Sequence, residues 1–211
     1  MTANVLSSKS IFSNLSSRLE VRMLGLVIVI AACLSFLSPH FLTSNNLFNI
    51  LDQSVVIGIV AVGMTMVILI GGIDLSVGSV AGVTGIILGL ALQHVPIPVA
   101  ILLAILSGAG IGLFSGILTA FFGLAPFVVT LGVMAIGRSL AYIFSGQTAI
   151  SNIPDSLSNI VYTSIFGVPS NVLFLVVLYI VAWAYLTWTK GGRTIYAVGS
   201  NKEAARTAGL N

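Results

Sequence analysis

The chain has 211 residues, of which 57% are hydrophobic and only 6% are charged. Soluble domains carry about 25% charged residues, so this composition excludes a soluble globular protein. The net charge of +3 does not indicate nucleic-acid binding, because nearly all the basic residues lie near the two ends of the chain and flank apolar sequence. We therefore expect an integral membrane protein.

Residues 1–20 are rich in Ser and Asn and are expected to form a cytoplasmic tail. Uncharged apolar segments follow at about 21–38, 53–71, 75–93, 98–122, 126–144 and 171–189. Each approaches the ~20 residues that cross a hydrocarbon core as a helix. The sequence thus predicts an all-α polytopic membrane helix bundle over 21–189, with about six transmembrane segments. The second and third are so close together that one of them need not cross completely.

Basic residues flank the apolar region on both sides. They are Lys9, Arg18 and Arg22 before the first segment, and Lys190, Arg193, Lys202 and Arg206 after the last. The intervening segments 39–52, 94–97 and 145–170, which are expected to be loops, contain no Lys or Arg, and the longest has room for a short surface helix. The positive-inside rule then places both termini in the cytoplasm, and an even number of crossings agrees.

The single cysteine, Cys33, lies within the first apolar segment and cannot support a disulfide framework. Residues 30–33 also resemble a lipoprotein cleavage site, whose use would remove the first segment. A retained helix fits the charge distribution better.

A polar, glycine-rich break occupies residues 71–79 between two long apolar stretches. Its polar and small residues are Gly71, Gly72, Asp74, Ser76 and Ser79. The two glycines can unwind or end a helix, and a carboxylate here is costly unless it lines a polar cavity or an interface. Interrupted helices recur beside the solute paths of transporters. The alternative is a short cytoplasmic turn in which Asp74 caps the next helix, and local chemistry leaves both open.

Residues 71–79 resemble the signature of the ribose-type sugar permeases of bacterial ATP-binding cassette (ABC) importers. Residues 126–132, which include Phe127 and Thr130, and residues 192–199 are similar to two further stretches of that family, in the same order. The resemblance implies a permease subunit that imports a monosaccharide, ribose-like, or a related small polyol-like solute. It implies that the translocation path runs past the residues of the break and past Phe127 and Thr130.

The C-terminal segment 190–211 has features of its own. Ser200 and Glu203 have the spacing of a capping box and Gly209 suits a C-terminal cap, so we expect a short helix over 201–208. Residues 203–205 with Gly209 also resemble the EAA loop of ABC permeases, which implies ATPase coupling through Ser200, Glu203, Ala204, Ala205 and Gly209. The alternative is a helix lying at the lipid headgroups, helped by Lys202 and Arg206.

Arg138 is a charge within the fifth apolar segment. A guanidinium there is expensive unless it faces the bundle interior or reaches interfacial water. One possibility is that it donates hydrogen bonds into the translocation path or to an acidic group such as Asp74. The other is that its side chain extends (snorkels) to the membrane surface.

No catalytic residues, metal site or cofactor are expected. His40 and His94 lie alone, and no phosphate-binding loop is present, so a partner chain would hydrolyse ATP. An intramembrane serine enzyme at Ser115 is disfavoured because no histidine lies in a segment. An ATP-independent channel or facilitator remains as an alternative.

The resemblance also implies partners and a location. These are a cytoplasmic ABC ATPase, a second permease subunit that is identical or different, and a periplasmic or extracellular solute-binding protein, around a bundle in the bacterial inner membrane. Full-length relatives continue through several more spans beyond the coupling helix. We therefore expect this chain to be truncated after that helix. It would then be either a non-functional fragment of such a permease or one part of a split permease subunit.

Overall fold

The computed structural model describes residues 19–151, 153–165 and 167–210. The predicted tail over 1–20 therefore lies almost entirely outside the described residues. The chain divides into two compact units, one ending at Leu51 and the other beginning at Asp52. Each unit is described by itself.

The first unit contains α2 (Leu19–Leu37) and the first turns of α3 (Ser44–Leu69). At the start of α3, the Thr43 hydroxyl accepts a hydrogen bond from the Asn46 backbone N–H, and the Asn46 side chain donates to the Phe41 carbonyl at 2.7 Å. The prediction of a loop over 39–52 was wrong in its second half. Polar residues such as Asn46 continue the helix outside the apolar stretch, so hydropathy alone places its start too late.

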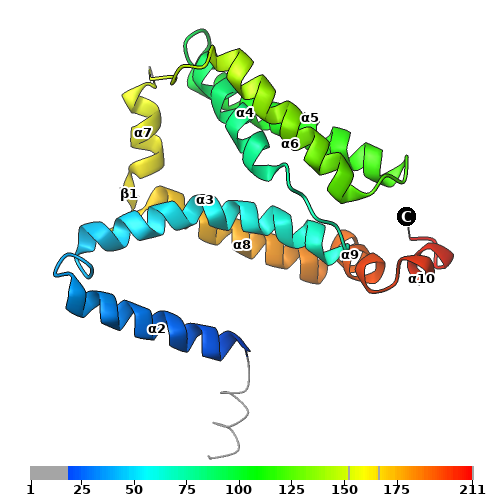
Figure 1. Ribbon diagram of the computed structural model, residues 1–211, viewed down its shortest axis with the longest axis horizontal. Helices are drawn as coiled ribbons and strands as arrows, with labels where there is room; N and C mark the ends of the chain where they lie inside the picture. The colour runs from blue at the N-terminus through cyan, green and yellow to red at the C-terminus, as the bar shows by residue number, and fades with distance from the viewer. Residues whose placement is uncertain (1–18, 152, 166, 211) are drawn as a thin grey trace, which may run out of the picture. The chain divides into compact units, whose positions relative to one another are not determined.

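The second unit contains a group of three packed helices: α4 (Val77–Ala91), α5 (Ile97–Ala120) and α6 (Pro126–Ser145) (Figure 1). The side chains of Val83, Val129 and Val133 are buried in this group. A Cβ at Gly108 of α5 would lie 3.1 Å from the Thr84 side chain, so the small residue allows α4 and α5 to approach closely.

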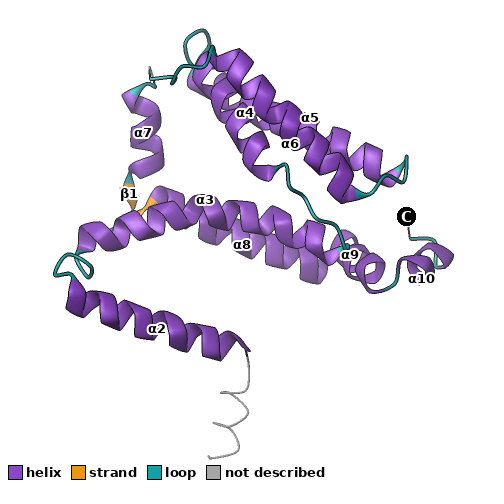
Figure 2. Ribbon diagram, in the orientation of Figure 1, coloured by secondary structure: helices purple, strands orange, loops and turns teal. Residues whose placement is uncertain are grey.

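The rest of the second unit follows α6. Helix α7 (Asp155–Tyr162) leads to a short antiparallel hairpin of β1 (Ser164–Ile165) and β2 (Val168–Pro169), then to α8 (Ser170–Trp188), α9 (Lys190–Ser200) and α10 (Lys202–Thr207). Helices dominate the described chain, as Figure 2 shows. The Ser170 hydroxyl lies within hydrogen-bonding distance of the carbonyl oxygens of Ile160 and Val161, so α7 is tied to the start of α8.

Helices α3 and α8 are joined by two observed contacts. The Asn171 side chain donates a hydrogen bond to the Asp52 carboxylate, and Gly58 leaves no free space beside the Leu175 side chain. Asp52 thus lies inside a helix and has a polar partner on the neighbouring one. Such a pair lowers the cost of a carboxylate close to apolar sequence.

Within the described residues, four helices, α3, α5, α6 and α8, are long and apolar enough to cross a membrane, whereas the apolar stretches Val21–Leu37 and Val77–Ala91 are shorter. At 1.5 Å per residue, the 15 residues of α4 span only about 22 Å of a hydrocarbon core of ~30 Å. The predicted all-α polytopic membrane architecture is confirmed. The short α4 agrees with the prediction that the second or third segment need not cross completely.

Candidate functional site

Helix α3 ends at a glycine turn. Gly71 has a φ of +79°, its N–H donates to the Ile68 carbonyl at 2.9 Å, and the Gly72 N–H donates to the Val67 carbonyl at 2.9 Å. This pair of bonds is a Schellman motif, in which a residue in the left-handed conformation satisfies the last carbonyls of a helix. Of the two possibilities left open by the sequence, that Gly71 and Gly72 unwind a helix or end it, the structure shows the second.

The Asp74 carboxylate is half-buried and bonds to the residues that follow it. Its Oδ1 atom accepts a hydrogen bond from the Ser76 backbone N–H at 2.7 Å and another from the Ser76 hydroxyl at 2.6 Å. Ser76 is itself only 2% exposed and precedes the first residue of α4. The carboxylate therefore closes a local turn just before α4. The alternative prediction that Asp74 caps this helix was wrong, because the N-cap is Ser76 and no side chain makes a capping hydrogen bond there.

Thr130 of α6 joins the break to the helix group. Its hydroxyl accepts a hydrogen bond from the Leu75 backbone N–H at 3.2 Å and lies 3.3 Å from the Ile73 carbonyl, to which it can donate. The side chain is 5% exposed. The stretches 71–79 and 126–132, which sequence reasoning selected separately, therefore meet in space.

Ser79 lies one turn further along α4 and faces Gly137 of α6. Its hydroxyl donates to the Ser76 carbonyl at 2.7 Å, and a Cβ at Gly137 would lie 2.9 Å from that hydroxyl oxygen. Sequence reasoning did not select Gly137. Its signal is the helical spacing, because Thr130, Val133 and Gly137 recur at the intervals that place residues on one helix face.

The side chains of two predicted site residues lie apart from this cluster. Phe127 is 51% exposed, although its carbonyl oxygen lies 3.4 Å from the Thr130 hydroxyl. The exposed side chain of Arg138 makes no hydrogen bond or ion pair with any other residue that the structure describes. The suggested pairing of Arg138 with Asp74 is not formed. The structure thus brings together Gly72, Asp74, Ser76, Ser79 and Thr130.

The C-terminal segment differs from its predicted capping. The N-cap of α10 is Asn201, whose side chain accepts a hydrogen bond from the Ala204 N–H at 3.0 Å, and Ser200 is the last residue of α9. The prediction that Ser200 caps this helix was wrong, because α9 continues through Ser200. Asn is as good an N-cap as Ser, so the cap moves by one residue. Glu203 lies in the first turn, where the helix dipole favours a negative charge.

The other end of α10 agrees with the sequence. Gly209 has a φ of +78°, its N–H donates to the Arg206 carbonyl at 3.0 Å, and the Leu210 N–H donates to the Ala205 carbonyl at 2.9 Å. This is a second Schellman motif, and the prediction of Gly209 as the C-terminal cap is confirmed. Ala205 is buried, whereas Ala204 is exposed.

Residues 46–211 match the family described as the permease component of branched-chain amino acid transport systems. The chain is 36% identical to the ribose import permease protein RbsC of Escherichia coli K12, over 100% of this chain and 67% of that protein. It is 34% identical to the D-allose transport system permease protein AlsC of the same strain, over 87% of this chain and 57% of the relative. It is 31% identical to the autoinducer 2 import system permease protein LsrD of Photorhabdus laumondii, over 90% of this chain and 60% of that protein. The chain thus spans about two thirds or less of the length of these relatives. No solved structure matches the chain.

Proposed function

Because the chain belongs to the family of transport-system permease components, we propose that it is a membrane subunit of an ABC importer for ribose or a related small monosaccharide. The observation that carries this proposal is the joining of the 71–79 break to α6 through Thr130. An irregular backbone at membrane depth needs polar partners, and the Thr130 hydroxyl supplies them.

The proposed partners are a cytoplasmic ATPase, a second permease subunit and an external solute-binding protein. The relatives are import permeases, which supports this set. Helix α10 would dock on the ATPase, with Glu203 exposed for a basic partner residue and Gly209 ending the helix sharply. In this scheme the partner ATPase hydrolyses ATP, and this chain forms part of the path through which the solute crosses the membrane.

A direct contact offers a route from α10 to the break. Helix α9 ends immediately before α10, and Gly199 of α9 lies so close to the Leu69 carbonyl that a Cβ has no room. Leu69 is the last residue of α3, two positions before the Gly71 turn. A displacement of α10 would therefore reach the end of α3 through α9. For this coupling to work, α9 and the end of α3 would have to adopt two different arrangements.

We also propose that both termini face the cytoplasm and that the bundle lies in a bacterial inner membrane. The basic residues before and at the start of α2, and those after α8, support this orientation. Alkaline phosphatase fused after His94 should be active, whereas the same enzyme fused after Lys190 should be inactive.

The test is uptake of labelled ribose by an Escherichia coli strain that lacks its own ribose permease but retains the ATPase and binding protein. Uptake that requires both this chain and cellular ATP would support the proposal. Co-purification of the ATPase with the chain separates failure of assembly from failure of transport. Ribose entry unaffected by ATP depletion would instead identify a facilitator, and no entry despite ATPase binding would contradict a complete permease subunit.

A further inference from the structure

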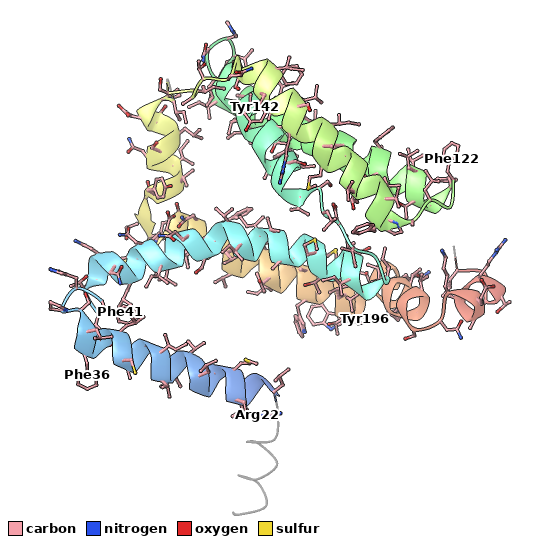
Figure 3. All side chains as sticks on the ribbon, viewed as in Figure 1. Arg22, Phe36, Phe41, Phe122, Tyr142 and Tyr196 are labelled. Carbon is pink, nitrogen blue, oxygen red and sulfur yellow. The ribbon has the colours of Figure 1, made fainter. Side chains whose placement is uncertain are left out.

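The two faces of α9 are chemically different. Its glycine face lies against the same chain: Gly191 beside the Tyr185 side chain, Gly192 beside the backbone at 185–186, and Gly199 beside Leu69. The opposite face carries Lys190 and Arg193, both exposed. Tyr196, which is labelled in Figure 3, lies at the border of this face and is 49% exposed. Gly192 is buried and Gly191 half-buried, so this side of α9 is covered at its start, where the opposite, exposed side is basic.

The end of α8 fixes the depth at which these charges lie. Trp183 and Trp188 form an edge-to-face pair with ring centroids 5.0 Å apart, and their side chains are 56% and 66% exposed. Exposed indoles at the end of a membrane-crossing helix gather at the boundary between hydrocarbon and headgroups. Lys190 follows Trp188 by two residues, so its charge lies at headgroup depth.

Arg193 is held at the same level by a hydrogen bond. One of its guanidinium nitrogens, Nη1, donates to the Trp188 carbonyl at 3.3 Å. This bond covers one of the free carbonyls at the end of α8 and leaves the other guanidinium donors available. A guanidinium with free donors matches the geometry of a phosphate group, which it binds through two parallel hydrogen bonds.

We propose that Lys190 and Arg193, together with Trp188, form a binding surface for the phosphate headgroups of anionic phospholipids. Charge complementarity supports it, since no Asp or Glu occurs between Asp155 and Glu203. Continuity with α8 favours lipid over an acidic protein, because the tryptophan pair places these cations at the membrane surface. The inference does not rest on transport and applies to the chain in any bilayer.

The chain carries its own probe, because Trp183 and Trp188 are its only tryptophans. The full chain is reconstituted in phosphatidylcholine bilayers that contain a fixed fraction of phosphatidylglycerol, and either lipid is brominated in its acyl chains to quench the indoles. We expect brominated phosphatidylglycerol to quench more strongly, corresponding to a local enrichment of about twofold or more. Raising the salt concentration should reduce the excess.

Matched variants locate the effect. K190Q/R193Q should abolish the excess quenching, whereas K190R/R193K should retain it. K202Q/R206Q removes the same number of charges from α10 and should leave the excess unchanged. Circular dichroism of each variant checks that the helices are intact.

Equal quenching by the two lipids in the unaltered chain would overturn the proposal. So would an equal loss in both glutamine variants, which would indicate diffuse attraction by net charge. The proposal would also be overturned if Lys190 and Arg193 bind the ATPase in place of lipid. In that case the unaltered chain would show no preference for phosphatidylglycerol, and K190Q/R193Q would abolish binding of the ATPase.

Discussion

The hydroxyl of Thr130 accepts a hydrogen bond from the backbone N–H of Leu75 at 3.2 Å, across 55 residues of sequence. This hydrogen bond joins α6 to an irregular segment, whose N–H groups lack the carbonyl acceptors that a helix would provide. The hydroxyl is buried with the valines of the same helix, so water does not readily replace it. The Thr130 hydroxyl therefore helps to hold the 71–79 break against α6, in addition to the covalent continuation of the break into α4.

Replacing Thr130 by Val removes this oxygen and keeps the shape of the side chain. The Leu75 N–H then loses its acceptor, and we expect unfolding in detergent to become easier by about 1 to 2 kcal/mol. Thr130→Ser should keep most of the stability. Thr119→Val is the control, because the Thr119 hydroxyl bonds only within its own helix, to the Ser115 carbonyl. Equal losses from the two valine variants would contradict the proposed role of Thr130.

Gly71→Ala tests the helix end that precedes the break. Its φ of +79° is unfavourable for a residue with a Cβ, so we expect a loss of about 1 to 2 kcal/mol in the free energy of unfolding. Gly71→Asn should cost less, because Asn tolerates this conformation. Gly78→Ala is the control in α4, where an added methyl group would have no neighbouring atom within 4 Å. It should be neutral or slightly stabilising by thermal unfolding.

The sequence predicts the helices of this chain better than their contacts. Long uncharged stretches and flanking glycines or prolines are local signals, so the ends of α3 at Gly71 and of α10 at Gly209, and the start of α6 at Pro126, were all placed correctly. The pairing of Thr130 with Leu75 has no local signal, since nothing in either stretch specifies which distant hydroxyl meets which N–H. Only the resemblance to one family suggested that both stretches matter together.

Helix α9 was missed for a different reason. Gly191 and Gly192 follow Lys190, and two adjacent glycines argue against a helix by propensity. In the structure they are the residues that allow α9 to lie directly against the end of α8. Tertiary packing therefore outweighs propensity here. The same helix displaced the predicted cap of α10 from Ser200 to Asn201.

Gly137→Ala should disturb the packing of α4 on α6. The new methyl would lie 2.9 Å from the Ser79 hydroxyl oxygen and 3.1 Å from its Cβ, so the two helices must separate. Such overpacking typically costs about 1 to 3 kcal/mol. Gly132→Ala, in the same helix with no atom within 4 Å, should not destabilise the chain. Adding Ser79→Ala removes the nearer atom and should recover part of the loss, which a double-mutant cycle measures. Equal thermal stability of the two glycine variants would be inconsistent with this packing.

Gly199→Ala should separate α9 from the end of α3. Because the Leu69 carbonyl occupies the space that a Cβ needs, we expect a loss of about 1 to 3 kcal/mol and faster hydrogen exchange over residues 195–200. Gly63→Ala in α3, which has no neighbour within 4 Å, is the control. If the contact carries motion from α10, Gly199→Ala should also reduce ATP-driven uptake while the ATPase still binds. Unchanged exchange in this segment would exclude the contact.

The last prediction separates the two candidate caps of α10. The Asn201 side chain accepts a hydrogen bond from the Ala204 N–H at 3.0 Å, so Asn201→Ala should destabilise this helix by about 0.5 to 2 kcal/mol. The amide of Ala204 should then exchange with solvent up to roughly tenfold faster, whereas Asn201→Asp or Asn201→Ser should keep it protected. Ser200→Ala is the matched control and should leave the exchange unchanged, because Ser200 ends α9. Faster exchange in Ser200→Ala, with no effect in Asn201→Ala, would return the cap to Ser200 and restore the capping box with Glu203.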